Sequence, residues 1–103
     1  MFIEQLDHLV LTVSNMQQSL DFYSRTLGMK PVSFVNGRCA LTFGSQKINL
    51  HQAGKEWNPK AAHPTLGSAD LCFTSNLPLN DVIKHFHDQG ISIEEGPVAR
   101  TGA

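Results

Sequence analysis

The stretch L-D-H-L-V-L-T-V, residues 6–13, decides how this chain folds, because its side chains alternate in the way typical of a β-strand. One face of the expected strand is wholly aliphatic and is formed by Leu9, Leu11 and Val13. The other face carries His8. We therefore expect the aliphatic face to pack in the core and the face of His8 to stay available for chemistry.

A helix is predicted directly after this strand. Ser14 and Gln17 have the spacing of a capping box, and Gly28 suits the end of a helix because glycine readily adopts positive φ. The apolar residues between them recur at helical intervals: Met16, Leu20, Tyr23 and Leu27. Three more strands are predicted over residues 29–35, 38–43 and 46–52, separated by Asn-Gly and Gly-Ser turn signals. The order is β-α-β-β-β.

The same pattern begins again 62 residues later, counted from His8 to Asp70. D-L-C-F-T at residues 70–74 matches H-L-V-L-T at residues 8–12, and Gly90 stands at the same offset from Gly28. Between them, a second amphipathic helix is predicted after Pro78, with an apolar stripe of Leu79, Val82, Ile83 and Phe86. A further strand is expected over residues 91–94. The repeat predicts two βαβββ modules.

We therefore predict an α+β fold of paired βαβββ modules in one small domain, with the second module incomplete at the C-terminus. The first module would span residues 1–53, a linker residues 54–67, and a partial second module residues 68–103. At the same offset, partners for the strands at 38–43 and 46–52 would begin near position 100 and run past Ala103.

Composition narrows the class of partner. The chain has 41% hydrophobic and 17% charged residues and a formal net charge of -1, so it lacks the basic excess that nucleic acid or an anionic membrane requires. A small-molecule substrate is the expected partner. Cys39 and Cys72 lie in apolar, strand-like runs without Cys-x-x-Cys spacing, and no signal peptide is recognisable. We expect a soluble, reduced, cytoplasmic protein.

Strand alternation also predicts the site. Because Leu9, Leu11 and Val13 face the helix, His8 lies on the opposite face of the sheet. The same alternation on the strand at 46–52 puts Asn49 and His51 on that opposite face. The repeat places Asp70 at the position equivalent to His8. His8, His51 and Asp70 are N and O ligands that suit a divalent ion such as manganese, nickel, iron, cobalt or zinc.

Simpler roles remain open for each of these residues. A buried histidine is usually hydrogen-bonded in the core, and an aspartate at the start of a strand often only bonds nearby backbone N–H groups. The loop with Trp57 and Lys60 could close over an anionic substrate or simply be solvated. Arg38 and Arg100 could bind a carboxylate, although the sequence places neither of them.

Three longer phrases resemble a known family. They are L-D-H-L-V-L-T-V, S-L-D-F-Y-S-R-T-L-G-M and F-G-S-Q-K-I-N-L-H-Q-A-G-K-E-W, and K-A-A-H-P and I-E-E-G-P-V-A-R-T-G-A extend the match over nearly the whole chain. The chain resembles the vicinal oxygen chelate (glyoxalase/bleomycin resistance/dioxygenase) superfamily, and within it the glyoxalase domain-containing protein 5 group. The resemblance implies paired modules that hold a metal able to chelate vicinal oxygens of a substrate.

The resemblance also assigns expected roles. His8 falls on the first-strand ligand position, Asp70 on its equivalent in the second module, and His51 on a strand where some members carry a glutamate or histidine ligand. The family's closing-strand glutamate has no counterpart among the 103 residues, so the catalytic residue stays unassigned.

The implied activity is that of a lactoylglutathione lyase-like enzyme acting on a small molecule such as a glutathione hemithioacetal. The alternatives are an iron(II) extradiol-type dioxygenase, a metal-free sequestering protein of the bleomycin-resistance kind, and a purely structural dimerisation domain. Unpaired sheet edges favour a homodimer.

Overall fold

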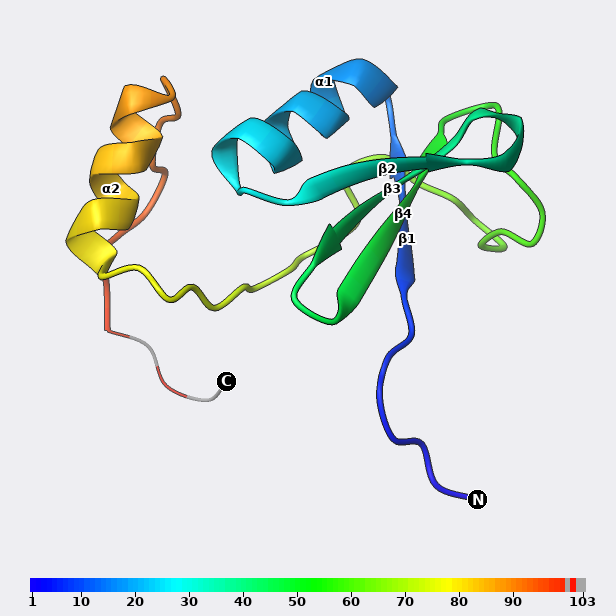
Figure 1. The fold of residues 1–103 in the computed structure, drawn as a ribbon, viewed down its shortest axis with the longest axis horizontal. Helices are drawn as coiled ribbons and strands as arrows, with labels where there is room; N and C mark the ends of the chain where they lie inside the picture. Colours follow the sequence, from blue (N-terminus) through cyan, green and yellow to red (C-terminus); the bar gives the residue numbers. More distant parts are fainter. Residues whose placement is uncertain (100, 102–103) are drawn as a thin grey trace. The chain divides into compact units, whose positions relative to one another are not determined.

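The computed structural model describes residues 1–99 and 101, and the chain forms two compact units, Met1–Asp70 and Leu71–Ala103 (Figure 1). Arg100, which the sequence suggests as a residue that could bind a carboxylate, lies outside the described residues. None of the helices in the described residues combines the length and the apolar character that crossing a bilayer requires.

The first unit contains a four-stranded mixed sheet with the strand order β1-β4-β3-β2. Its strands are β1 (Leu9–Val13), β2 (Lys30–Phe34), β3 (Arg38–Phe43) and β4 (Gln46–Gln52). β1 runs parallel to β4, and the other neighbours are antiparallel. This α+β arrangement is the predicted first module, and the bounds of β3 and β4 are as predicted. β1 starts three residues later than expected, because ladder pairing begins at Leu9, opposite Ile48.

Helix α1 (Met16–Asp21) follows β1 and continues into a π-helical turn, η1 (Phe22–Thr26). The expected cap at Ser14 is wrong. Asn15 is the N-cap residue: its backbone is extended, and its side-chain Oδ1 accepts a hydrogen bond from the Gln18 N–H at 2.9 Å. Gly28 has φ of +74° after the last turn, which confirms the predicted helix end.

The core lies between the sheet and this helix (Figure 1). It is built from the buried side chains of Leu11, Met29, Leu41, Ile48 and Leu50. The helical stripe predicted from the sequence packs against it, namely Met16, Leu20, Tyr23 and Leu27. The prediction that the aliphatic faces of β1 and β4 point towards the helix is thereby confirmed.

The second unit contains helix α2 (Leu79–Asp88), which begins after Pro78 as predicted. Gly90 follows it with φ of +72°, close to the value at Gly28, so the repeated glycines share one backbone conformation. The strands expected at residues 70–74 and 91–94 are absent from the described structure, and that expectation was wrong for these residues. A strand exists only where its backbone pairs with another, and no described segment pairs with either stretch.

Candidate functional site

The face of the sheet opposite the core is called the outer face here, and on β1 and β4 it consists of Val10, Thr12, Asn49 and His51. These four residues alternate with the core residues, and the strand register pairs Val10 with Asn49 and Thr12 with His51. The predicted placement of Asn49 and His51 away from the helix is therefore confirmed by the register.

His51 is the most enclosed polar residue of this face, with only 7% of its surface exposed. Burial lowers the pKa of His51, and the neighbouring cations Arg38 and Lys60 lower it further, while the carboxylate of Glu56 acts in the opposite direction. The imidazole is therefore neutral at physiological pH, which leaves one ring nitrogen with a free lone pair.

The loop after β4 brings charged and aromatic groups to the same region. The guanidinium carbon of Arg38 lies 4.7 Å from the ring centre of Trp57. Glu56 accepts a hydrogen bond from the Gly54 N–H at 2.6 Å, and its carboxylate is 3.9 Å from the Lys60 ammonium. The Gly54 N–H holds the pKa of Glu56 below its usual range, so this carboxylate is ionised at neutral pH.

Two buried polar atoms have no hydrogen-bond partner among the described residues: Nε of Arg38 and Oδ1 of Asn49. Arg38 starts β3, where the β3–β4 register pairs Ala40 with Asn49. Arg38 and Ala40 are two residues apart, so the two unpaired atoms belong to side chains on the same face of adjacent strands. Buried polar groups in folded proteins are almost always paired with protein or with ordered water, so these two atoms are the ones on the outer face whose partners lie outside the described protein groups.

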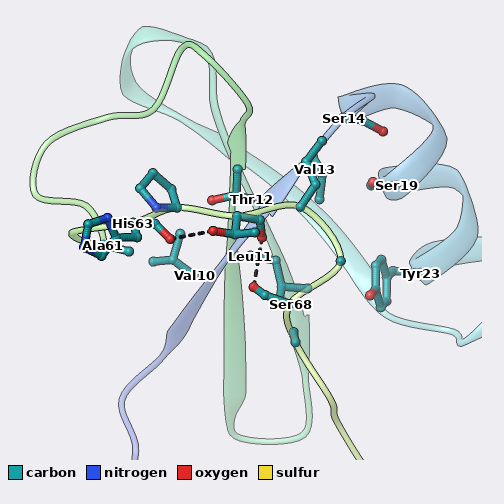
Figure 2. Close-up of a pocket in the computed structure, with 15 residues that line it drawn as sticks. Val10, Leu11, Thr12, Val13, Ser14, Ser19, Tyr23, Ala61, His63 and Ser68 are labelled. Atoms are coloured by element: carbon teal, nitrogen blue, oxygen red, sulfur yellow. Dashed lines mark hydrogen bonds between the residues drawn. The ribbon is translucent and has the colours of Figure 1, made fainter.

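A cavity of about 370 Å³ opens along β1, with the segment Ala61–Ala69 as its far wall (Figure 2). Val10 and Thr12 contribute from the strand, and Ser19 and Tyr23 from the helix. The wall segment is held by its own hydrogen bonds: the Thr65 hydroxyl donates to the His63 carbonyl at 2.8 Å, and the Ser68 hydroxyl donates to the Thr65 carbonyl at 2.9 Å. The volume is within the range of small-molecule sites.

His8 lies directly before β1, and its Nδ1 is 2.7 Å from the Asp7 carboxylate. Hydrogen bonding to His8 lowers the pKa of Asp7, so the carboxylate is ionised and can only accept. Nδ1 therefore carries the proton and donates it, which leaves Nε2 as the ring atom free to bind a metal. This is the arrangement in which carboxylates orient ligating histidines.

The comparison with known families agrees with this architecture. A family model, the Glyoxalase/Bleomycin resistance protein/Dioxygenase superfamily, matches residues 5–102. The chain belongs to this superfamily.

Similar proteins come from bacteria and a fungus. A virulence protein of Salmonella typhimurium is 55% identical over the whole chain, which spans 72% of that protein, and its crystal structure superposes with a TM-score of 0.95 over 82% of the solved chain. An integron cassette protein from the mobile metagenome of V. cholerae is 58% identical, with a TM-score of 0.94 covering all of this chain and 80% of that one. A glyoxalase domain-containing protein of Mycosarcoma maydis is 55% identical over 98% of this chain, which spans 57% of that protein.

Members of the superfamily usually bind a divalent metal. Across residues 1–99 and 101, no group of three or more His, Cys, Asp or Glu side chains is placed to hold a metal ion. His51 is buried on the outer face, His8 precedes β1, and Asp70 is an exposed residue at the end of the first unit. These residues alone do not supply a complete metal site, and the ligand set His8, His51 and Asp70 stays a prediction.

Sequence reasoning missed the stack of Arg38 on Trp57 and the group around Glu56. The signal for Arg38 was available in part, because strand alternation assigns Arg38 to the face of Ala40, opposite Asn49. The position of Trp57 depends on the path of a loop and has no periodic signature. The loop after β4 therefore supplies the aromatic and charged groups near the outer face, and its path cannot be predicted from strand alternation.

Proposed function

We propose that the protein is a glyoxalase-type lyase or isomerase that acts on a small molecule at the outer face of its sheet. The observation that carries the proposal is the unpaired, buried Oδ1 of Asn49 between the buried, neutral His51 and the start of β1. Superfamily membership supports it, and the 370 Å³ cavity along β1 shares Val10 and Thr12 with the outer face, while Asn49 and His51 do not line it.

A divalent metal is part of this proposal, with His8, His51 and Asp70 as its candidate ligands; the β1–β4 register sets His8 and His51 four residues apart along the sheet, so both bind one ion only if the segment before β1 moves. Nickel, manganese, iron, cobalt and zinc all accept such N and O ligands. The free Nε2 of His8 and the depressed pKa of His51 support the two histidines as ligands, since only neutral imidazole binds a metal. The catalytic base is unassigned.

The test is metal content by elemental analysis and metal affinity by calorimetry. We expect about one equivalent of divalent metal per chain, and we expect His8→Ala to weaken its binding by at least roughly tenfold. Asp7→Asn removes the carboxylate that orients His8 and should weaken binding by a similar factor. His87→Ala is the matched control, because His87 is exposed on α2. Binding that is absent, or that is equally strong in His8→Ala, would contradict the proposal.

The bound metal then separates two kinds of enzyme. A glyoxalase-type lyase consumes a hemithioacetal without oxygen, which is followed by absorbance. An extradiol-type dioxygenase requires iron(II) and consumes oxygen with a catechol, which is followed with an oxygen electrode.

A second candidate function is sequestration without turnover, as in bleomycin-resistance proteins. The observation that favours it is the apolar and aromatic part of the cavity lining along β1, which includes Val10, Tyr23 and Leu66. Such walls suit an aromatic ligand held without chemistry. Tight binding of a ligand that the protein returns unchanged, with no bound metal, would favour this function over the lyase.

A homodimer in the cytoplasm completes the proposal. In the described sheet, β1 and β2 are edge strands with one unpaired side each, which favours strand addition by a second copy. Cys39 and Cys72 are free thiols, which suits a reducing compartment. Light scattering gives the oligomeric state directly, and a monomeric mass at micromolar concentration would contradict the dimer.

A further inference from the structure

The cavity along β1 borders the free edge of that strand. Five consecutive residues, 10–14, line it, although side chains on a strand alternate between two faces. A cavity that touches every successive residue of a strand lies along its edge, where the main chain is accessible. β1 is an edge strand of the described sheet and pairs with β4 on its other side. The main chain of β1 therefore borders the cavity, which lies wholly within the first unit.

One hydrogen bond shows which main-chain groups of β1 face the cavity. The Val13 carbonyl accepts from the Ala53 N–H at 2.8 Å, so the main chain of Val13 faces β4. In a parallel pair, each residue directs its N–H and C=O to the same side, and the side alternates along the strand. Leu11 therefore also faces β4, and the N–H and C=O groups of Val10 and Thr12 face the free edge. None of these four groups has a hydrogen-bond partner among residues 1–99 and 101.

The rest of the lining limits what the cavity can bind. The wall segment Ala61–Ala69 stands opposite β1, and the hydroxyls of Thr65 and Ser68 on it already donate to carbonyls of the same segment (Figure 2). Among the described residues, the lining includes no Asp, Glu, Lys or Arg side chain. A charged group would lose its hydration there without gaining an ionic partner. The cavity therefore suits an uncharged ligand that offers both N–H donors and C=O acceptors to β1.

We propose that the free edge of β1 binds an internal, uncharged segment of a partner polypeptide, which lies in the cavity as an added strand. Strand addition of this kind derives its affinity from main-chain hydrogen bonds. Val10 and Thr12 are two residues apart, about 6.6 Å along the strand, so a segment of three residues can pair with all four groups. The termini of a polypeptide are charged and belong outside this cavity, so an internal segment fits it better than a free short peptide does. The site is separate from the proposed metal site, because His51 and Asn49 do not line the cavity.

Three peptides of similar size test the required chemistry. N-acetyl-trialanine-amide stands for an internal segment. N-acetyl-trisarcosine-amide is its isomer without N–H donors on the three residues, and free trialanine carries charged termini. Binding is measured by calorimetry with EDTA present, so the result is independent of the metal test. We expect the capped trialanine to bind at least about tenfold more tightly than either of the other two peptides.

Amide hydrogen exchange, followed by NMR, locates the bound peptide. In the free protein, the amides of Val10 and Thr12 should exchange at least about tenfold faster than those of Leu11 and Val13, which face β4. Saturating capped trialanine should slow the exchange of Val10 and Thr12 at least about fivefold and leave that of Leu11 and Val13 nearly unchanged.

Two neighbouring alanines provide a matched pair of variants. Both are exposed, and Ala61 lines the cavity whereas Ala62 does not. Ala61→Trp should weaken the binding of capped trialanine at least about tenfold, because the indole takes up part of the space that the peptide needs. Ala62→Trp should change the affinity by less than about twofold.

Equal binding of the alanine and sarcosine peptides, or of capped and free trialanine, would overturn the proposal. Unchanged affinity in a folded Ala61→Trp protein would also overturn it, as would no protection of the Val10 and Thr12 amides at about 10 mM peptide. Affinity that falls as the protein concentration rises would show that a second copy of the chain occupies this edge, which would likewise overturn the proposal. The peptide comparison and the exchange measurement use the wild-type protein, so they decide the outcome even if Ala61→Trp does not fold.

Discussion

Gln52, at the end of β4, fastens the strand to the start of helix α1. Its Oε1 accepts a hydrogen bond from the Met16 N–H at 3.1 Å. Its Nε2 donates to the Ser14 carbonyl at 2.6 Å and, at the longer distance of 3.4 Å, to the Val13 carbonyl. One side chain thus holds the junction between β1 and α1, where Val13 and Ser14 also line the cavity.

Gln52→Ala removes all three contacts. The two shorter hydrogen bonds contribute about 1 kcal/mol each, and the longest adds little, so we expect the free energy of unfolding to fall by about 2 kcal/mol. For a domain of this size that corresponds to a fall of roughly 8–16 °C in Tm. Gln52→Glu keeps the acceptor for Met16 but turns a carboxylate oxygen towards the Ser14 and Val13 carbonyls, so its loss should be at least as large as that of Gln52→Ala.

The assay is urea unfolding followed by the fluorescence of Trp57, which reports on the first unit. Gln17→Ala is the control, because Gln17 is an exposed glutamine on helix α1 and not on the junction with β4. A loss of unfolding free energy below about 0.5 kcal/mol in Gln52→Ala relative to this control would refute the argument, because removing two side-chain hydrogen bonds should lower stability by more than that. The same result would mean that water replaces the glutamine at the junction.

Two further predictions concern stability. Asn15→Ala should lower the free energy of unfolding by about 1 kcal/mol, because it removes the side-chain cap of α1. Ser14→Ala should lower it by less than about 0.5 kcal/mol. Urea titrations of the two variants check both values. Burial lowers the pKa of His51 below 6.5, so its contribution to stability is complete above that pH and is lost as the pH falls towards the folded-state pKa. Urea midpoints at pH 7.5 and 5.5 should therefore differ more in the wild-type protein than in His51→Gln; an equal difference would contradict the buried, neutral histidine.

Much of the first unit follows from local rules. The bounds of β3 and β4 are as predicted because turn residues mark both ends: Asn36 and Gly37 adopt φ of 62° and 73°, a conformation that these two residue types tolerate best. The buried face of each strand follows from period-two alternation, which is a property of the backbone and needs no knowledge of the partner strands.

The second unit contains a stretch that local rules predicted wrongly to be a strand. Residues 70–74 match residues 8–12 in pattern, yet only the first stretch forms a strand, because Leu9–Val13 pairs with Ile48–Gln52. Alternation predicts which face a strand would bury, but it does not provide the neighbour that makes the strand. The helix cap was wrong for a related reason: Ser14 and Asn15 are both good caps, and the choice between them depends on Gln52, which bonds the Ser14 carbonyl from 38 residues away.

The candidate site was likewise predictable from the sequence only in part. The shared face of Asn49 and His51 was predictable, since both lie on one strand. The surroundings that set the pKa of His51 were not, because burial, which lowers it most, depends on the packing of the loop after β4, and the charges that act on it come from Arg38 on a neighbouring strand and from Glu56 and Lys60 in that loop. Periodicity assigns a side chain to a face, and only the path of the loop decides which charges meet it.

The alternation of β4 also explains how a small sheet can carry polar side chains on its outer face although burying them costs free energy. Ile48 and Leu50 are almost fully buried in the core, with 2% and 1% of their surfaces exposed, while Asn49 and His51 alternate with them on the other side. The backbone that carries the polar pair is thus fixed by its apolar neighbours. Because the unpaired Oδ1 of Asn49 contributes nothing favourable to this packing, replacing Asn49 by an apolar residue of similar size should leave stability unchanged or raise it.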